Sequence, residues 1–576
     1  MSETNRMVVV SLLAGLFSGL AAVLLLKLID LVKSGSDLLS RSLPEGLGSF
    51  VSPGIGMLLS LLIVTFLVKD DIGHGVTRVL VAVSRSESRI KPHNMWSSVL
   101  TSSLTIGMGG SVGAEAPIVY TGAAIGSNLG RLFGLSYRNL TTLLGCGAAG
   151  AIAGIFKAPL AGVLFTMEVL LFNNSMSSIG PLLISSVSAT FVSYLFLGHS
   201  FPFHCAITPF SMGNVPFYLL LGVFGGLISV YFLRTTLALE DRIGKMRSKT
   251  MRWVISAIGV GLMVSLFPQL FGEGYGSIGV LLSGADPIEG GGGTLKALAH
   301  SKWGVPAFFL AVMLLKVFAM TLTNAGGGVG GTFGPTLFVG AIAGFVLSRT
   351  INIIAPLGAS VPEQNFTLVG MAALMAGVMQ APMTAIFLIA EITDGYELFL
   401  PLIIASTVSF GTTRIFERYS IYSKRVAQAG QLLTHDSDHS ALALMSVADL
   451  VRDKYPPVPK DATLREILPV IQESDAQVFP VLDSKGRLKG YLEMDRLRKY
   501  IFRTELYDSL NVHDLMEPPN TVAYIDEPMA SVMQKFDKTG AWRIPVLECD
   551  GRYKGFVSRS RVLSAYREEL KLITED

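Results

Sequence analysis

A glycine-rich segment occurs twice in this chain, inside a background with few charges. GGSVGAEAP (Gly109–Pro117) returns as GGVGGTFGP (Gly327–Pro335), and both copies continue into apolar stretches with glycines at matching places. Between Lys91 and Arg131 the first copy carries a single formally charged side chain, Glu115. A lone carboxylate in an apolar segment is costly unless it faces water, protein or an ion. Glu115 is therefore a candidate functional residue.

Composition places most of the chain in a membrane. Of the 576 residues 50% are hydrophobic and only 15% are charged, and the mean hydropathy is +0.52. Such a chain has too little polar surface for an ordinary soluble protein. The net charge is +3 and the basic residues are scattered, so we expect no nucleic-acid partner. The three cysteines lie far apart and predict no metal site.

Apolar runs long enough to cross a bilayer recur along the first three quarters of the chain. Many are interrupted by glycine and proline, a pattern typical of broken helices that surround a buried site. An odd number of crossings between the two repeats would make the halves inverted. The uncharged runs are Met7–Leu26, Val51–Val68, Val254–Gly272, Val317–Ser348 and Gln364–Ala390.

Two further echoes support an internal duplication. The segment Gly147–Glu168 is repeated as Gly370–Glu391, and GHGV at Gly73 is echoed by GEGY at Gly272. Three matches in the same order are hard to attribute to chance. We therefore predict an all-α polytopic membrane domain of two related, inverted-repeat halves over residues 1–434.

The composition changes to dense charge after Arg414, where a second repeat begins. VADL, PVL and GRLKG are followed at a constant offset by VHDL, PVL and GRYKG. Short apolar strands, turn glycines and helical runs indicate two small α/β units. We assign residues 435–576 to this soluble tail, with repeats at about 446–505 and 511–570.

Glycine-rich helix starts suit the binding of anions. They present unpaired backbone N–H groups, and the helix dipole adds positive potential. Gly113–Pro117 and Gly331–Pro335 each place proline where a first helical turn tolerates it. The alternative is that the glycines only allow close helix packing. Glu115 lies where the anion would bind and is predicted to act as a gate, or alternatively to cap its own helix.

These motifs resemble the CLC family of chloride channels and proton-coupled chloride exchangers. The matching features are GxExP at Gly113, GxFxP at Gly331, a GxG segment at Gly73 and the two Ala-Pro helices that end at Glu168 and Glu391. The paired repeat in the tail resembles the tandem CBS domains that many members carry. The resemblance covers nearly the whole chain.

The resemblance implies roles for particular residues. Glu115 would be the gate, and Tyr422 would offer its hydroxyl to the central anion, although on residue type alone it is equally an interfacial aromatic. A homodimer with one pathway per subunit is also implied. The backbone amides that would line the anion sites belong to Ala114, Ala116, Thr332 and Phe333.

Two departures from the family pattern bear on mechanism. His74 stands where the family has a serine, and a protonated imidazole there would bind an anion; alternatively it is an ordinary polar side chain. Val169 stands where exchangers commonly carry an inward glutamate. Valine cannot relay a proton, so the sequence favours a gated chloride channel, with a proton-coupled chloride antiporter as the alternative.

The tail offers a divided nucleotide motif. Asp495 follows one repeat's last strand and Ser558 the other's, so an adenine nucleotide is expected there only as an optional ligand; the alternative is a purely structural tail.

No cofactor is required, and the transported ligand is chloride. A CBS-linked cation transporter is a distant alternative that would need carboxylate clusters. Enzyme motifs are lacking in the sequence, so we expect no enzyme but an integral protein of a bacterial plasma membrane, with a cytoplasmic tail.

Overall fold

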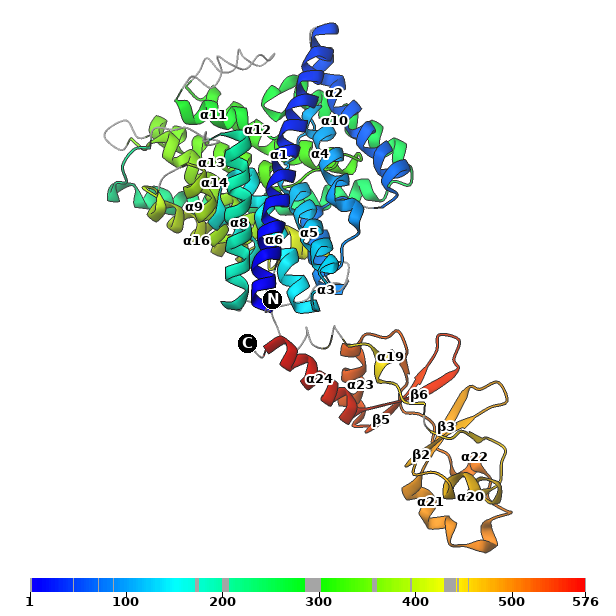
Figure 1. Ribbon diagram of the computed structural model, residues 1–576. Coiled ribbons are helices and arrows are strands. Elements are labelled where there is room, and N and C mark those ends of the chain that lie inside the picture. Colours follow the sequence, from blue (N-terminus) through cyan, green and yellow to red (C-terminus); the bar gives the residue numbers. More distant parts are fainter. Residues whose placement is uncertain are drawn as a thin grey trace. The chain divides into compact units, whose positions relative to one another are not determined.

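The chain forms two compact units in the computed structural model. They comprise Met1–Leu432 and Leu433–Asp576 (Figure 1). The predicted boundary between residues 434 and 435 lies outside the described residues. The structure describes residues 3–44, 46–70, 72–85, 88–170, 176–198, 207–284, 302–354, 360–393, 396–428, 442, 445–453 and 455–574.

The first unit is built from helices. Those of its first half are α1 (Glu3–Ser42), α2 (Leu47–Leu62), α3 (Gly75–Arg85), α4 (Ser97–Gly107), α5 (Glu115–Leu132), α6 (Tyr137–Phe156), α7 (Pro159–Val169) and α8 (Met176–Leu197). Those of its second half are α9 (Val215–Gly244), α10 (Lys249–Leu266), α11 (Tyr275–Ser283), α12 (Gly304–Ala325), α13 (Phe333–Ile354), α14 (Glu363–Met379), α15 (Pro382–Ile392), α16 (Phe399–Phe416) and α17 (Ile421–Gln428).

Within the described part of the chain, nine helices are long and apolar enough to cross a membrane. Several carry large apolar side chains on their outer faces, such as Phe191 and Leu195 on α8. Exposed side chains of this size suit contact with lipid. The predicted run Val317–Ser348 is broken, because α12 ends at Ala325 and α13 begins only at Phe333.

Helix α1 is longer than its apolar run predicts. The uncharged run ends at Leu26, whereas the helix continues to Ser42 and packs along α6 and α8 (Figure 1). The added turns carry Asp30 and Lys33, which face a cavity instead of lipid. A hydropathy criterion stops at the first charges and so missed these turns.

The sequence repeat reappears as a structural repeat. Helix α5 packs on α6 as α13 packs on α14. A side chain at Gly122 would overlap the carbonyl oxygen of Gly147, and one at Gly340 would overlap that of Gly370. These matching glycines therefore allow close helix packing, the alternative that the sequence left open for individual glycines.

The two Ala-Pro helices cap each other across the repeat. The Glu168 carboxylate, near the end of α7, accepts the N–H groups of Met383 and Thr384 at the start of α15, at 3.0 and 2.7 Å. Glu391, near the end of α15, accepts those of Leu160 and Ala161 at the start of α7, at 3.0 and 2.8 Å. Both glutamates thus satisfy backbone donors that would otherwise lack partners.

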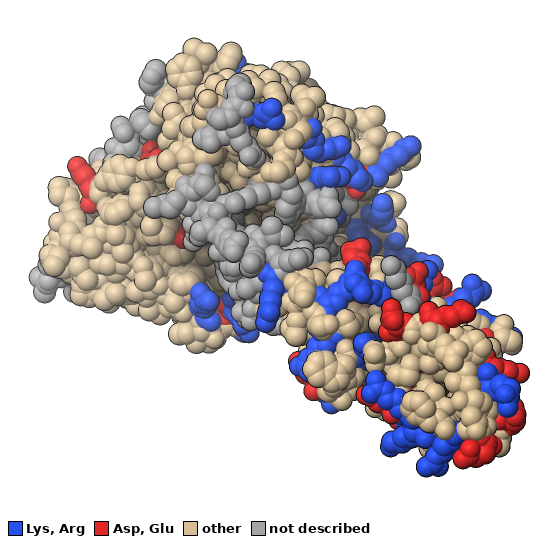
Figure 2. Space-filling model, turned by 60° about the horizontal axis from the view of Figure 1, so that its bottom comes forward, with Lys and Arg blue, Asp and Glu red and all other residues tan. Residues whose placement is uncertain are grey.

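The second unit contains the two predicted α/β copies. Each holds a three-stranded sheet, ordered β1-β2-β3 and β4-β5-β6, with one parallel and one antiparallel pair. Figure 2 shows Lys, Arg, Asp and Glu crowded over this unit. Its elements are α19 (Val447–Leu450), β1 (Val458–Pro459), α20 (Leu464–Gln472), β2 (Val478–Leu482), β3 (Leu488–Glu493), α21 (Met494–Ile501), α22 (Val512–Leu515), β4 (Ala523–Tyr524), α23 (Met529–Thr539), β5 (Arg543–Leu547), β6 (Tyr553–Ser558) and α24 (Arg559–Thr574).

Candidate anion site

The two glycine-rich segments meet in the first unit. Gly113 donates its N–H to the carbonyl oxygen of Gly331 at 3.0 Å, and Gly331 donates to that of Gly113 at 2.7 Å. Directly after these paired residues, α5 begins at Glu115 and α13 begins at Phe333. The duplicated motifs, far apart in the sequence, therefore bring two helix starts together.

The Glu115 carboxylate lies at the start of the opposite repeat's helix. Its Oε2 accepts the N–H of Gly334, in the first turn of α13, at 3.2 Å. Its Oε1 accepts the hydroxyl of Tyr275. The side chain is 1% exposed, so the charge is held away from solvent by these donors. A carboxylate thus occupies a position where the dipole of α13 favours an anion.

Tyr422 and Thr332 form the next contact of this region. Tyr422 lies on α17, and its phenolic oxygen accepts the Thr332 hydroxyl at 3.3 Å; both side chains are buried. Thr332 directly precedes α13, so a hydroxyl from the end of the unit's sequence reaches the repeated motif. This contact connects two of the residues that the resemblance singled out.

The other residues whose backbone amides were predicted to line the anion sites are buried as well. Ala114 and Ala116 are buried on either side of Glu115. Phe333 is also buried, with its ring 5.5 Å from that of Phe156 and 6.0 Å from that of Phe165, centre to centre. The aromatic packing fixes the start of α13 and leaves its main chain to face Glu115.

His74 lies near a carboxylate that pairs with the helix of Tyr422. It directly precedes α3, in a left-handed backbone conformation with φ of 54°. Its Nε2 is 3.8 Å from Oε1 of Glu240, which also pairs with Arg425 on α17 at 2.5 Å. Arg425 lies one helical turn from Tyr422, so His74 is linked to the Tyr422 helix through this carboxylate. Its role as an anion ligand stays a prediction.

Val169 is buried at the end of α7, next to the capping residue Glu168. The structure therefore supplies an apolar side chain at the position where exchangers commonly carry a glutamate.

In the tail, Asp495 pairs with Arg498 at 3.3 Å and Ser558 lies 3.4 Å from the Ser560 hydroxyl. These local contacts leave the nucleotide assignment a prediction.

Three residues at this site were not predicted from the sequence. Glu273 Oε1 accepts the N–H of Ala114 at 3.0 Å, and Tyr275 contacts Glu115. Lys316 is fully buried on α12 and donates to the carbonyl oxygen of Gly272 at 2.8 Å. The segment GEGY had been noted only as an echo of GHGV. Extending the function assigned to GHGV to its echo would have found Glu273.

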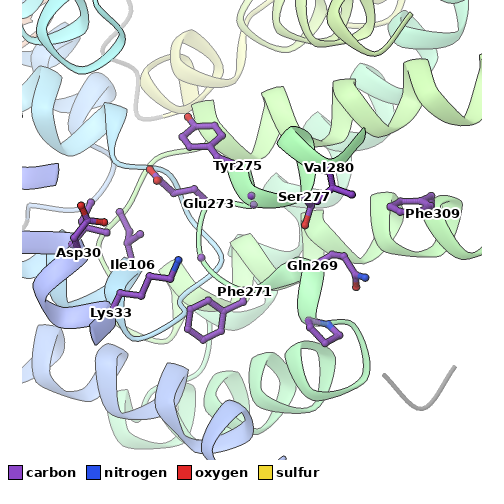
Figure 3. Close-up of a pocket in the computed structure, with 15 residues that line it drawn as sticks. Asp30, Lys33, Ile106, Gln269, Phe271, Glu273, Tyr275, Ser277, Val280 and Phe309 are labelled. Atoms are coloured by element: carbon purple, nitrogen blue, oxygen red, sulfur yellow. The ribbon is translucent and has the colours of Figure 1, made fainter. Parts of the chain in front are cut away.

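A cavity of about 410 Å³ adjoins this group. Glu273, Tyr275 and Gln269 line it together with Asp30 and Lys33 of α1 (Figure 3). Because Tyr275 also contacts Glu115, the cavity ends one side chain away from the buried carboxylate. Among the described residues, no group of three or more His, Cys, Asp or Glu side chains is arranged to hold a metal ion.

Comparison with known proteins assigns the family. The model of the voltage gated chloride channel family matches residues 55–414, and that of the CBS domain matches residues 447–503 and 512–568. The chain belongs to the CLC family. It is a membrane protein with a CLC transport unit and a C-terminal CBS pair, as the motifs had indicated.

Its relatives include proteins named as chloride channels and proteins named as proton/chloride exchangers. The chain is 28% identical over 57% of its length to the voltage-gated ClC-type chloride channel ClcB of Escherichia coli O17:K52:H18, covering 75% of that protein. It is 27% identical over 72% of its length to the H(+)/Cl(-) exchange transporter ClcA of Vibrio cholerae serotype O1, covering 87% of that protein. The crystal structure of a slow cyanobacterial Cl-/H+ antiporter shares the fold, with a TM-score of 0.64, 20% identity and coverage of 74% of this chain and 98% of the other.

Proposed function

We propose that this CLC protein carries chloride and similar monovalent anions across a membrane, with Glu115 as its gate. The observation that carries the proposal is the position of the Glu115 carboxylate on the N–H of Gly334, at the start of α13. It occupies the kind of site that a small anion would use. The paired main chains of Gly113 and Gly331 hold the two helix starts in place.

The geometry gives each group a task in this mechanism. An ionised Glu115 holds the α13 start and repels an approaching anion. Once protonated or displaced, the carboxyl group leaves the N–H groups of α13 to an anion. The Tyr422 hydroxyl accepts the Thr332 hydroxyl and so keeps its own hydrogen to donate to the anion. Converging N–H dipoles favour anions over cations, which argues against the cation-transporter alternative.

We favour a channel over a proton-coupled antiporter. A coupled exchanger needs a proton carrier on the side of the anion path away from the gate, and the side chain at that position is Val169. The antiporter stays the alternative, since a relative named as an exchanger aligns along most of the transport unit. Neither mechanism involves an enzymatic reaction.

The proposal includes an assembly and a location. We propose a homodimer with one anion pathway in each subunit, in a bacterial plasma membrane, with the CBS pair on the cytoplasmic side. The family assignment and the bacterial relatives support these points.

Substitution of the gate tests the function. Glu115→Gln mimics the protonated carboxyl group, so chloride efflux from vesicles that contain the full chain should be faster at neutral pH and should depend less steeply on pH than in wild type. Glu363→Gln is the control, because Glu363 begins α14 and is ion-paired with Arg349, away from Glu115. Unchanged pH dependence in Glu115→Gln would reject the gate, and no chloride efflux from wild type would reject the transport function.

An adenine nucleotide is proposed as an optional ligand of the tail. Equilibrium binding of ATP to the full chain in detergent measures it. Asp495→Asn should weaken binding by about tenfold or more, since a charge-assisted contact is worth about 1.5–3 kcal/mol. Asp508→Asn is the control, because Asp508 is a similarly exposed carboxylate that pairs with Arg465. Absence of saturable binding would leave the tail a structural unit.

A further inference from the structure

Each of the two converging helix starts is occupied by a carboxylate. At α13 the carboxylate is that of Glu115, on the N–H of Gly334. At α5 it is that of Glu273, on the N–H of Ala114, the residue directly before the helix. The second carboxylate therefore covers a backbone amide that the sequence assigned to anion binding.

Glu273 faces the cavity, whereas Glu115 is enclosed behind it. Glu273 and Tyr275 form one part of the cavity wall, with Asp30 and Lys33 of α1 also lining it (Figure 3). The Tyr275 hydroxyl then contacts Glu115. Glu273 and Tyr275 therefore stand side by side on the cavity wall, and each contacts a group at the converging helix starts.

The segment that carries Glu273 is firmly anchored. Lys316 donates to the carbonyl oxygen of Gly272, and Ser111 donates its hydroxyl to that of Leu270 at 2.7 Å. Gly274 has a φ of 92°, and a side chain there would overlap the ring of Phe338. The anchored main chain thus places the Glu273 side chain within reach of the Ala114 amide.

Several charged side chains act on the Glu273 carboxylate. The buried ammonium of Lys316 attracts both carboxylates, while the Glu115 and Glu273 carboxylates repel each other. Protonation of one carboxylate therefore changes the charge felt by the other. The titratable and charged groups that face Glu273 are Glu115, Tyr275, Lys316, Asp30 and Lys33.

The internal repeat supplies independent support. Glu273 lies in GEGY, two residues before the first residue of α11, and its echo GHGV carries His74, the residue directly before α3. The two segments thus hold equivalent places in the two halves. One half therefore carries a glutamate, which is negative when ionised, where the other half carries a histidine, which is positive when protonated.

We propose that Glu273 is a second gating carboxylate, which controls entry of anions from the cavity to the start of α5. The inference rests on the proposed transport function. Ionised, Glu273 occupies the Ala114 N–H and repels an incoming anion. Neutralised, it no longer repels the anion, which then takes the amide and moves on toward Glu115.

The experiment compares chloride efflux from vesicles with the same pH inside and outside, across acidic to neutral pH, for the full chain. Glu273→Gln should raise efflux at neutral pH and move the pH of half-maximal efflux upward by about one unit, a tenfold change in proton concentration. The pH dependence that remains should come from Glu115 and vanish in the double variant. Asp30→Asn is the matched control, because it removes a negative charge from the same cavity wall but has no contact with Ala114 in the described structure.

The outcomes separate the inference from the proposed function. A wild-type pH profile for Glu273→Gln, or the same change in Asp30→Asn, overturns the second gate even when Glu115→Gln behaves as expected. No chloride efflux from wild type and Glu115→Gln overturns the transport function instead. If Glu273→Gln does not fold, Glu273→Asp withdraws the carboxylate by one methylene and should shift the profile in the same direction; an unchanged profile rejects the proposal.

Discussion

Glu115 sits on a backbone amide of a helix from the other half of the transport unit. A glutamate at a helix start ordinarily interacts with its own helix. Reaching across is feasible because Gly113 has no side chain, and a methyl group there would overlap Glu115 Oε2. Gly113 thus has two roles: its main chain pairs with Gly331, and its lack of a side chain leaves room for the Glu115 carboxylate.

This contact predicts the effect of Gly113→Ala. The added methyl group should displace the carboxylate from Gly334, so the variant should resemble Glu115→Gln, with faster chloride efflux at neutral pH and a weak dependence on pH. Gly411→Ala in α16 is the control, because its new methyl group meets no atom within 4 Å. A Gly113→Ala protein with wild-type pH dependence would contradict the geometry.

Tyr275→Phe tests the hydroxyl that binds Glu115. A hydrogen bond to a charged group contributes about 1.5–3 kcal/mol, and it favours the ionised form that closes the path. Its loss should allow Glu115 to be protonated at lower proton concentration. We expect the pH of half-maximal efflux to rise by roughly one unit, measured in the same vesicle assay. A fall in that pH would show that the hydroxyl serves another purpose.

Among the elements, α7 and α15 are bound by reciprocal caps. Glu168 accepts two N–H groups of α15 and the Thr384 hydroxyl, while Glu391 accepts two N–H groups of α7. Because each glutamate belongs to the helix that the other caps, the pair joins the two halves of the transport unit. This arrangement supports a structural role for both glutamates.

Glu168→Ala should therefore lower stability without altering the gate. Loss of a helix cap costs about 0.5–2 kcal/mol, so we expect a lower melting temperature in detergent and a wild-type pH profile of chloride efflux. Glu397→Ala, at an exposed position between α15 and α16, should leave the melting temperature unchanged. An altered pH profile in Glu168→Ala would assign this carboxylate to the transport path instead.

The start of α23 in the tail carries a pH-dependent contact. Burial alone would raise the pKa of Glu527, but hydrogen bonds from Lys535 at 2.7 Å and Ser531 at 2.5 Å outweigh it and lower that pKa below its ordinary value. The stabilisation is therefore complete above the pKa of the unfolded chain and is lost as the pH falls through the folded value. Glu527→Gln should lower the melting temperature of the tail transition in the full chain at neutral pH, and the difference from wild type should shrink below about pH 4. A difference that persists in acid would contradict this.

At the scale of the whole molecule, the duplication made most of the architecture predictable. The repeated motifs indicated a helical membrane unit and an α/β tail, and both are present, because repeats and apolar runs are local properties of the sequence. Lys316 was missed because the sequence was searched for uncharged runs, and the run beside it begins only at Val317, although Lys316 is buried within α12. The contact of Glu273 with Ala114 was missed because it joins segments that are distant in the chain.

The choice between channel and antiporter also belongs to the scale of the whole molecule. Proton coupling needs titratable groups that continue from Glu115 to the other side of the transport unit. At the position where exchangers commonly carry the inner glutamate the structure has Val169, and the neighbouring Glu168 is engaged by backbone N–H groups of α15. A carboxylate fixed in this way is poorly suited to carry protons. The proposed channel mechanism rests on this region, and the proton-coupled antiporter is its alternative.

The reversal potential under a proton gradient, with equal chloride on both sides, measures the distinction directly. A channel selective for chloride reverses at zero, since chloride is balanced and protons are not carried, and we expect this for wild type. Val169→Glu supplies the absent carboxylate, and Val169→Gln is its uncharged control of similar size. A shift in wild type would establish exchange and require a proton path around Val169. A shift in Val169→Glu alone would identify this side chain as the step at which coupling is interrupted.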